Sequence, residues 1–264
     1  MYLNRIITLI SFLMVIWMGC SGRQPESSWT PEEYFKYAME LYTDEDYFEA
    51  TNEFTIIILR FSGSSVADSA EYYLGMSHYD MAEYIISAAE FEKLINTMSQ
   101  SPLVADAQYM LGMSFYEMSP RPSLDQEYTI KALKAFQIFV EDFPTHPKRN
   151  EIEKLLLELR EKLAEKAYLN AELYRKMLRW KSSIIYYDIV LEKYYDTEWV
   201  DDALLGKAIT YMDLDEWEKA REQLLILKEK FPDTDLSYSV ERNLRKVSYY
   251  IDGSEVEQSD GNEN

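Results

Sequence analysis

The sequence predicts an all-α protein, a superhelix of about five helix–turn–helix units in two blocks joined by a long helix. Residues that break helices are scarce, since the 264 residues include only 8 glycines and 8 prolines, well below the usual ~7% and ~5%. Aromatic and methionine residues, in contrast, recur at a fixed spacing along the chain. Apolar residues make up 47% of the sequence, enough for a full core in one or two domains.

The composition argues against several classes of function. The 47 acidic and 27 basic side chains give a formal charge of −20, and so acidic a surface repels the phosphate backbone of nucleic acids. One cysteine cannot form an internal disulfide. Two histidines, His78 and His146, leave little for a metal or acid–base site, and no phosphate-binding glycine loop or Ser/His/Asp set is present. We therefore expect no enzyme activity, no cofactor, no metal and no nucleic-acid partner.

Residues 1–19 are predicted to be a lipoprotein signal peptide. Arg5 precedes an apolar run from Ile6 to Met18, which is too short to span a bilayer as a helix. The run ends at Gly19 and Cys20 and resembles a lipobox, in which the cysteine receives diacylglycerol and acyl chains anchor the protein. Ser21, in place of aspartate, fits export to the outer membrane. The alternatives are a chance cysteine in a signal peptide or a short membrane anchor.

The two ends of the mature chain are predicted to lie outside the repeats. Residues 20–28 are small and polar and are read as a tether. Residues 251–264 are rich in acids and carry no base, so we expect a disordered acidic tail that cannot bury enough apolar surface to fold.

A period of 37 residues organises the first part of the chain, residues 29–147. An aromatic residue, a methionine and a tyrosine each return three times at this spacing, together with the small residues Ala38, Gly75 and Gly112. Each such segment is followed by a second helical pattern, such as Tyr47, Ala50 and Phe54. Small residues at the point where two helices touch and aromatics in the next layer are typical of a tetratricopeptide repeat. This part of the chain is therefore predicted to hold repeats 1–3.

Two further units are predicted in residues 148–250. Their phase is set by Ala171 and Ala208, which keep the same period, whereas the step from Gly112 to Ala171 is longer than one period. We assign the excess to an eight-residue insertion at Ser119–Gln126 and to an extended first helix of repeat 4. Lys148 to Leu178 holds no glycine or proline, so this range is predicted to be one long helix that connects the two blocks.

With this organisation, the chain resembles the BamD family, lipoproteins of the machinery that assembles outer-membrane β-barrels. The resemblance covers nearly the whole mature chain and includes Cys20. It rests first on the Asp125-Gln126 loop with the spaced residues that follow it, which are Thr129, Ala132, Phe136, Phe139 and Pro144. It rests also on two later motifs, which are Lys162-Leu163-Ala164 with Ala171 and Tyr174, and Tyr195-Asp196-Thr197. It implies lipid anchoring at the periplasmic face of the outer membrane and three kinds of partner: a BamA-type barrel subunit, other assembly lipoproteins and unfolded outer-membrane proteins.

The first helix of each repeat lines the concave, binding face of such a superhelix. The recurrent aromatic, methionine and tyrosine residues fall at the inward-pointing positions. Tyrosine offers contact area with a hydroxyl group, and methionine adapts to varied shapes. We therefore expect a groove for an extended peptide with aromatic residues, which the resemblance identifies as the C-terminal signal of unfolded barrel proteins; the alternative is that these are ordinary core residues. The groove residues are Phe35, Met39, Tyr42, Tyr72, Met76, Tyr79, Tyr109, Met113 and Tyr116.

By the same resemblance, the C-terminal block is expected to dock the barrel subunit. The candidate contacts are Arg175, Arg179 and Trp180, although Trp180 also fits a core position in the second helix of its unit. Two other functions stay open at this point. The chain also fits a generic lipidated tetratricopeptide adaptor or a glycan-binding lipoprotein that uses exposed aromatic residues.

Overall fold

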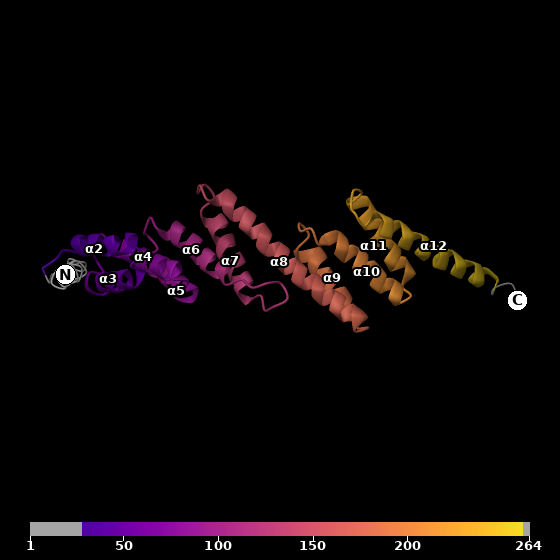
Figure 1. Ribbon diagram of the computed structural model, residues 1–264. Helices are drawn as coiled ribbons and strands as arrows, with labels where there is room; N and C mark the ends of the chain where they lie inside the picture. The colour runs from indigo at the N-terminus through magenta and orange to yellow at the C-terminus, as the bar shows by residue number, and fades with distance from the viewer. Residues whose placement is uncertain (1–27, 261–264) are drawn as a thin grey trace, which may run out of the picture. The chain divides into compact units, whose positions relative to one another are not determined.

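The computed structural model describes residues 28–260, which contain α-helices and no strand. Expectations for the signal peptide, for Cys20 and for the tether up to residue 27 lie outside the described residues. None of the described helices is long and apolar enough to cross a membrane. The helices, labelled in Figure 1, are α2 (Pro31–Thr43), α3 (Tyr47–Arg60), α4 (Ala67–Asp80), α5 (Tyr84–Thr97), α6 (Val104–Glu117), α7 (Glu127–Asp142), α8 (Arg149–Lys176), α9 (Trp180–Lys193), α10 (Val200–Asp213), α11 (Trp217–Lys230) and α12 (Ser237–Asp260).

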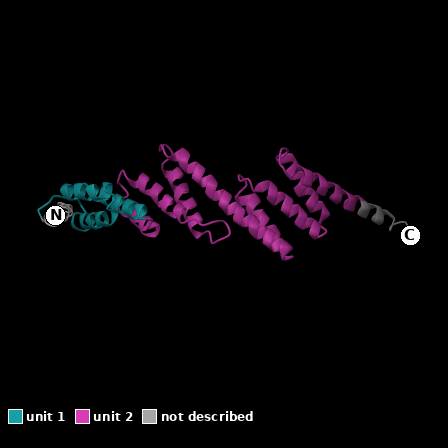
Figure 2. Cartoon of the chain, viewed as in Figure 1, with its two compact units in different colours: residues 1–81 teal, residues 82–264 magenta. Residues whose placement is uncertain are grey.

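The chain divides into two compact units, residues 1–81 and 82–264, which Figure 2 colours separately. The first unit contains α2 to α4, and the second contains α5 to α12. This division does not coincide with the block boundary expected between residues 147 and 148, because α7 and α8 on either side of that boundary pack against each other. The predicted bounds of the repeats remain a prediction.

Four of the turns between paired helices share one backbone conformation. Glu45, Ala82, Leu178 and Asp215 have φ angles of 63°, 59°, 57° and 59°, in the left-handed region that usually favours glycine. The step from Glu45 to Ala82 in sequence equals the step from Leu178 to Asp215, and both equal the period of the repeats. The backbone therefore repeats the period of the sequence without glycine at the turn.

Glycine is required elsewhere, where two helices approach closely. A Cβ atom on Gly112 of α6 would lie far inside van der Waals contact of the Phe136 ring of α7. A Cβ atom on Gly206 of α10 would overlap the Tyr187 ring of α9 in the same way. Both rings are fully buried, so they have little room to move. The small residue in each first helix thus admits an aromatic ring from a neighbouring second helix.

The long helix expected over Lys148–Leu178 is α8, which spans 28 residues from Arg149 to Lys176. Its first half packs on α7, where Ile152 and Leu159 are buried in one cluster with Phe136. Its second half packs on α9, and Ala164 and Ala171 are buried in one cluster with Tyr187 and Val190 of α9. One helix thus serves as the neighbour of two successive second helices (Figure 1).

The last helix, α12, covers the end of repeat 5. Val240, Val247 and Ile251 are buried in the same cluster as the core of α10 and α11, and the Tyr250 ring stacks on Trp217 with centroids 4.1 Å apart. The disordered tail was expected to begin at residue 251. That expectation is wrong for Ile251, because its side chain is buried in the core.

Candidate partner-binding surfaces

Six of the nine predicted groove residues lie in the first unit. Phe35, Met39 and Tyr42 are on α2, and the other three are on α4. All six side chains are half-buried. The three on α2 pack against the core of the first unit, which includes Ala38 and Phe54. Each of these residues therefore supports the core with part of its surface and presents the rest to solvent. The three on α4 are Tyr72, Met76 and Tyr79.

Tyr42 is held at both ends. Its hydroxyl donates a hydrogen bond of 2.6 Å to Asp80 Oδ2 of α4. Its ring makes edge contacts with Tyr47 and Tyr73 at centroid distances of 5.4 and 5.3 Å. Burial and the hydrogen bond to Asp80 raise the pKa of the Tyr42 phenol above its usual range. The hydroxyl is thus used inside the unit, and the ring is what Tyr42 can offer to a ligand.

The other three groove residues, Tyr109, Met113 and Tyr116, lie on α6 in the second unit and are also half-buried. The Tyr109 hydroxyl donates to Glu151 Oε1 of α8 at 2.8 Å, and the Tyr116 hydroxyl donates to Glu158 Oε1 at 2.6 Å. The two pairs have the same separation in sequence. The hydrogen bond to Glu158, together with burial, raises the pKa of Tyr116 to about 12.

These tyrosine–carboxylate pairs were not anticipated from the sequence. Their shared sequence separation was a signal for them, because two helices that run past each other in register bring residues together at a constant spacing. The pairs fix the hydroxyl groups and the ring orientations, while part of each side chain stays exposed. The residues of the expected groove are divided between the two units, so the groove itself stays a prediction. The partial burial of the nine side chains, in contrast, is observed within each unit.

The three candidate contacts for the barrel subunit differ in their surroundings. The Arg175 guanidinium binds the Glu172 carboxylate through Nε at 3.1 Å and Nη2 at 2.9 Å, and Tyr187 donates its hydroxyl to the same carboxylate. Hydrogen bonding to Glu172 raises the pKa of Arg175. Arg179 is exposed at the start of α9, and Trp180 is half-buried beside it. Arg179 is therefore the most accessible of the three.

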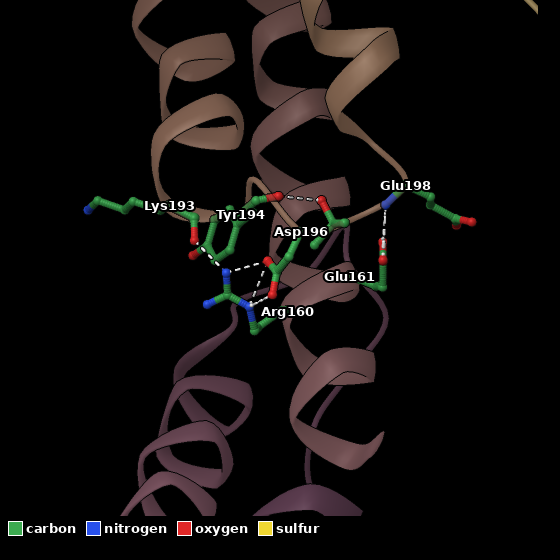
Figure 3. Close-up of polar contacts among 7 residues, drawn as sticks. Arg160, Glu161, Lys193, Tyr194, Asp196 and Glu198 are labelled. Carbon is green, nitrogen blue, oxygen red and sulfur yellow. Dashed lines mark hydrogen bonds and ion pairs between the residues drawn. The ribbon is translucent and has the colours of Figure 1, made fainter. Parts of the chain in front are cut away.

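The Tyr195-Asp196-Thr197 motif is tied to α8 (Figure 3). Arg160 of α8 donates from Nε to both carboxylate oxygens of Asp196 at 3.0 Å, and from Nη2 to the Lys193 carbonyl at 2.8 Å. The Arg160 guanidinium lowers the pKa of Asp196. At the next residue of α8, the Glu161 carboxylate accepts a hydrogen bond from the Glu198 backbone N–H at 3.0 Å. The motif thus fastens the α9–α10 turn to the middle of α8.

The Asp125-Gln126 loop is also closed by hydrogen bonds. Gln126 is buried and donates from Nε2 to the carbonyls of Arg121 and Leu124 at 3.0 and 3.1 Å, while its Oε1 accepts from the Thr129 hydroxyl at 2.7 Å. Two lysines of α8 reach the same loop, Lys162 to Ser119 Oγ at 2.9 Å and Lys166 to the Ser123 carbonyl at 3.0 Å. The motif therefore shapes the loop and holds it on α8.

Several known structures that resemble this chain are described as tetratricopeptide-repeat proteins. One from Bacteroides fragilis NCTC 9343 is 12% identical, with 83% of this chain and 98% of that chain covered and a TM-score of 0.46. Another from Parabacteroides merdae ATCC 43184 is also 12% identical, with 87% and 77% covered and a TM-score of 0.37. No curated protein matches the chain. The predicted all-α fold is confirmed for the described residues.

The sequence profile of the YfiO family, described as outer membrane lipoprotein, matches residues 28–226. The match includes α2 to α10, the Asp125-Gln126 loop and the Tyr195-Asp196-Thr197 motif. It therefore covers most of the chain, and the resemblance noted from the sequence is confirmed: the chain belongs to the YfiO family of outer membrane lipoproteins.

Proposed function

We propose that this protein is a non-enzymatic, lipid-anchored subunit of the machinery that assembles β-barrel proteins in the outer membrane. It acts at the periplasmic face, where its N-terminal repeats receive unfolded barrel proteins and its C-terminal repeats dock a BamA-type barrel subunit. Membership in a family of outer membrane lipoproteins supports the location. A fold made only of packed helix pairs in the described residues supports a role in binding other proteins.

The observation that carries the proposal is the state of the nine recurrent aromatic and methionine side chains. None of them is fully buried and none is fully exposed. Several tyrosine hydroxyls are held by carboxylates, as at Tyr42, Tyr109 and Tyr116. Rings that are already oriented lose little conformational freedom when a ligand packs on them. Such a surface suits a peptide with an aromatic end and varied neighbours, because methionine adapts to different shapes.

The acidic character of the chain also bears on the ligand. A formal charge of −20 favours segments that carry basic residues and disfavours acidic ones through long-range attraction and repulsion. We propose that apolar and aromatic contacts decide which segment is retained, while charge affects the rate at which it arrives. Arg179, Trp180 and Arg175 are the proposed contacts with the barrel subunit.

Site-directed photocrosslinking tests the first part of the proposal. A crosslinking side chain replaces Tyr72 in the first unit or Tyr109 in the second, and Leu225, an exposed leucine of α11, serves as the surface control. We expect adducts with a barrel-protein C-terminal peptide at Tyr72 and Tyr109, at least about fivefold above the control. The adducts should fall when the terminal aromatic residue of the peptide is replaced by alanine.

Two results would contradict this part of the proposal: no adduct at either position, or equal adducts at Leu225. Purification of the protein from membranes tests the second part. Recovery together with a large barrel protein supports assembly, whereas recovery without one, together with binding of an oligosaccharide, supports a glycan-binding lipoprotein instead.

A further inference from the structure

Each first helix of a repeat carries a stripe of residues that packs on the second helix of the preceding repeat. In α6 this stripe is Ala107, Met110, Leu111 and Ser114, all of them buried, and Ser114 is hydrogen-bonded to Ser87 of α5 at 3.0 Å. The corresponding stripe of α10 packs on α9 in the same way. It includes Gly206, at the Tyr187 ring, and Thr210, 3.5 Å from Ser183 Oγ.

The long helix α8 carries this stripe twice. In its first half the stripe is covered by α7, and Ile152 and Leu159 are fully buried. The same stripe continues fourteen residues later, which is close to four helical turns, so it stays on nearly the same face. Its residues there are Lys166, Leu169, Asn170 and Leu173, followed by Met177 just beyond the helix.

The second copy of the stripe has no helix over it among the described residues. The helix α7 begins at Glu127, and its first turns lie near Lys166, so it does not extend along the rest of α8. Leu169, Leu173 and Met177 are 40%, 54% and 56% exposed. The residues of α6 and α10 that are equivalent to Leu169 and Leu173 are buried, namely Met110, Ser114, Gly206 and Thr210. At its N-terminal end the stripe opens into a groove of about 770 Å³, which is walled by the Leu124 loop, Ile130 of α7 and Tyr186 of α9.

The two halves of α8 each have an uncovered face, and a comparison of these faces indicates that the stripe is not an ordinary solvent-exposed surface. The first half of α8 also has an uncovered face, because no second helix of its own repeat follows it. That face carries Asn150, Glu153 and Lys154, which are polar and remain solvated, and Leu157 interrupts them as an exposed apolar residue. The uncovered face of the second half carries Leu169, Leu173 and Met177, which are exposed apolar residues about one turn apart, beside the polar Lys166 and Asn170. Such a row of exposed apolar residues is typical of a surface that a partner covers.

The charges around the stripe indicate what kind of helix fits. Lys176 and Arg179 are exposed beside Leu173 and Met177, in a chain whose formal charge is −20. Two carboxylates near the stripe are already engaged with cations, Glu172 with Arg175 at 2.9 Å and Glu127 with Lys131 at 2.6 Å. An incoming helix therefore gains from carboxylates on its flanks, and it needs small residues opposite the bulky Leu169 and Leu173.

From these observations we infer that the second half of α8 is a docking site for an acidic amphipathic helix of another protein, which occupies the place of a missing second helix. The inference goes beyond the proposed function, because it follows from the packing of α8 and holds whichever protein carries the helix. The proposed docking surface consists of Leu169, Leu173 and Met177 and lies next to Arg179.

The test uses the full-length protein and two synthetic peptides with the same alanine and leucine stripe, each long enough for about four helical turns. One peptide has glutamates on its flanks and the other has lysines. We expect the glutamate peptide to bind and the lysine peptide to bind at least about tenfold more weakly by fluorescence anisotropy. Leu173→Asp should weaken binding of the glutamate peptide about tenfold or more, and Lys176→Glu about threefold. The matched control Leu225→Asp replaces a similarly exposed leucine of α11 and should leave the affinity unchanged.

The inference is overturned if the full-length protein binds neither peptide, if it binds both equally, or if Leu173→Asp changes the affinity no more than the control. A photocrosslinker at Leu173 in cells tests the occupant. An adduct with an acidic helical segment of another protein supports the inference. An adduct with residues 252–264 of the same chain, or with a second copy of the protein, overturns it.

Discussion

At the scale of single residues, a buried polar group without a hydrogen-bond partner lowers the stability of the folded state. Glu53 of α3 has one carboxylate oxygen, Oε2, that is buried without a hydrogen-bond partner. Burial, together with the nearby charge of Glu49, raises the pKa of Glu53. A raised pKa means that the folded state favours the protonated carboxyl group. Its contribution to stability is present below the unfolded pKa and is lost as the pH rises through the folded pKa.

Replacing Glu53 with glutamine should therefore stabilise the first unit at pH 7. The amide keeps the shape and removes the buried charge, so we expect a gain of about 0.5 kcal/mol at pH 7. The gain should shrink as the pH falls through the raised folded pKa of Glu53 and be absent below its unfolded pKa. Hydrogen exchange of the α2–α3 amides measures it. Glu222→Gln on α11, an exposed position, is the control and should have no effect. Slower exchange in wild type than in the variant at pH 7 would refute the assignment of strain to Glu53.

The sequence predicted the positions of the groove residues but not the hydrogen bonds that they make. Phe35, Met39 and their repeats were placed by periodicity, and the half-burial of these side chains is compatible both with a core role and with a binding face. The hydroxyl partners of Tyr109 and Tyr116 were missed. They lie on α8, and the register of α8 against α6 depends on the inserted Ser119–Gln126 loop, whose folded path no periodic pattern encodes.

At the scale of elements, α8 organises the second unit. Its first half is tied to α6 through Glu151 and Glu158, and its middle is tied to the α9–α10 turn through Arg160. The sequence predicted its length well, because a run without glycine or proline and with helical periodicity has few alternatives. The end was predicted two residues late, since the helix stops at Lys176 and Leu178 takes a left-handed turn. A leucine at that position gives no local signal for such a turn.

The ion pair between Arg160 and Asp196 should stabilise the α9–α10 turn measurably. We expect Arg160→Ala and Asp196→Ala each to destabilise the turn by about 1 kcal/mol, with most of the loss shared between the two in a double-mutant cycle, because the contact is bidentate but partly exposed. Hydrogen exchange of residues 193–199 is the measurement. The matched control is Arg221→Ala, which removes the exposed pair with Glu218 at 3.9 Å and should cost almost nothing.

The pH dependence gives this prediction a sign. Arg160 lowers the pKa of Asp196, so the stabilisation is present above the unfolded pKa of aspartate and is lost as the pH falls through the lower folded value. The difference between wild type and Arg160→Ala should therefore be full at pH 7 and vanish in strong acid. A difference that persists unchanged at pH 2 would mean that Arg160 acts through packing and not through the ion pair.

At the scale of the whole molecule, the core of a repeat protein must be covered at both ends of the row of repeats. Apolar faces that a further repeat would cover need a capping element. The helix α12 serves this purpose for repeat 5, and Val240, Val247 and Ile251 complete the cluster of α10 and α11. Composition alone placed the tail boundary at residue 251, because the acids that follow dominate the average. The spacing of Val240, Val247 and Ile251, at intervals of seven and four residues, was the helical signal that extended the fold to that point.

Two truncations should separate the cap from the acidic end. A chain that stops after Leu236 loses all of α12, which uncovers the cluster at Leu224 and Leu227. We expect the free energy of unfolding to fall by about 5 kcal/mol or more and the protein to aggregate. The reason is that three buried aliphatic side chains are removed, at about 1.5–3 kcal/mol each. A chain that stops after Asp252 keeps Val240, Val247 and Ile251 and should unfold at the same temperature as the full chain. Differential scanning calorimetry and gel filtration distinguish the two. Equal melting of all three chains would show that repeat 5 is complete without α12, and a large loss in the chain that ends at Asp252 would mean that the acidic residues beyond it contribute to the fold.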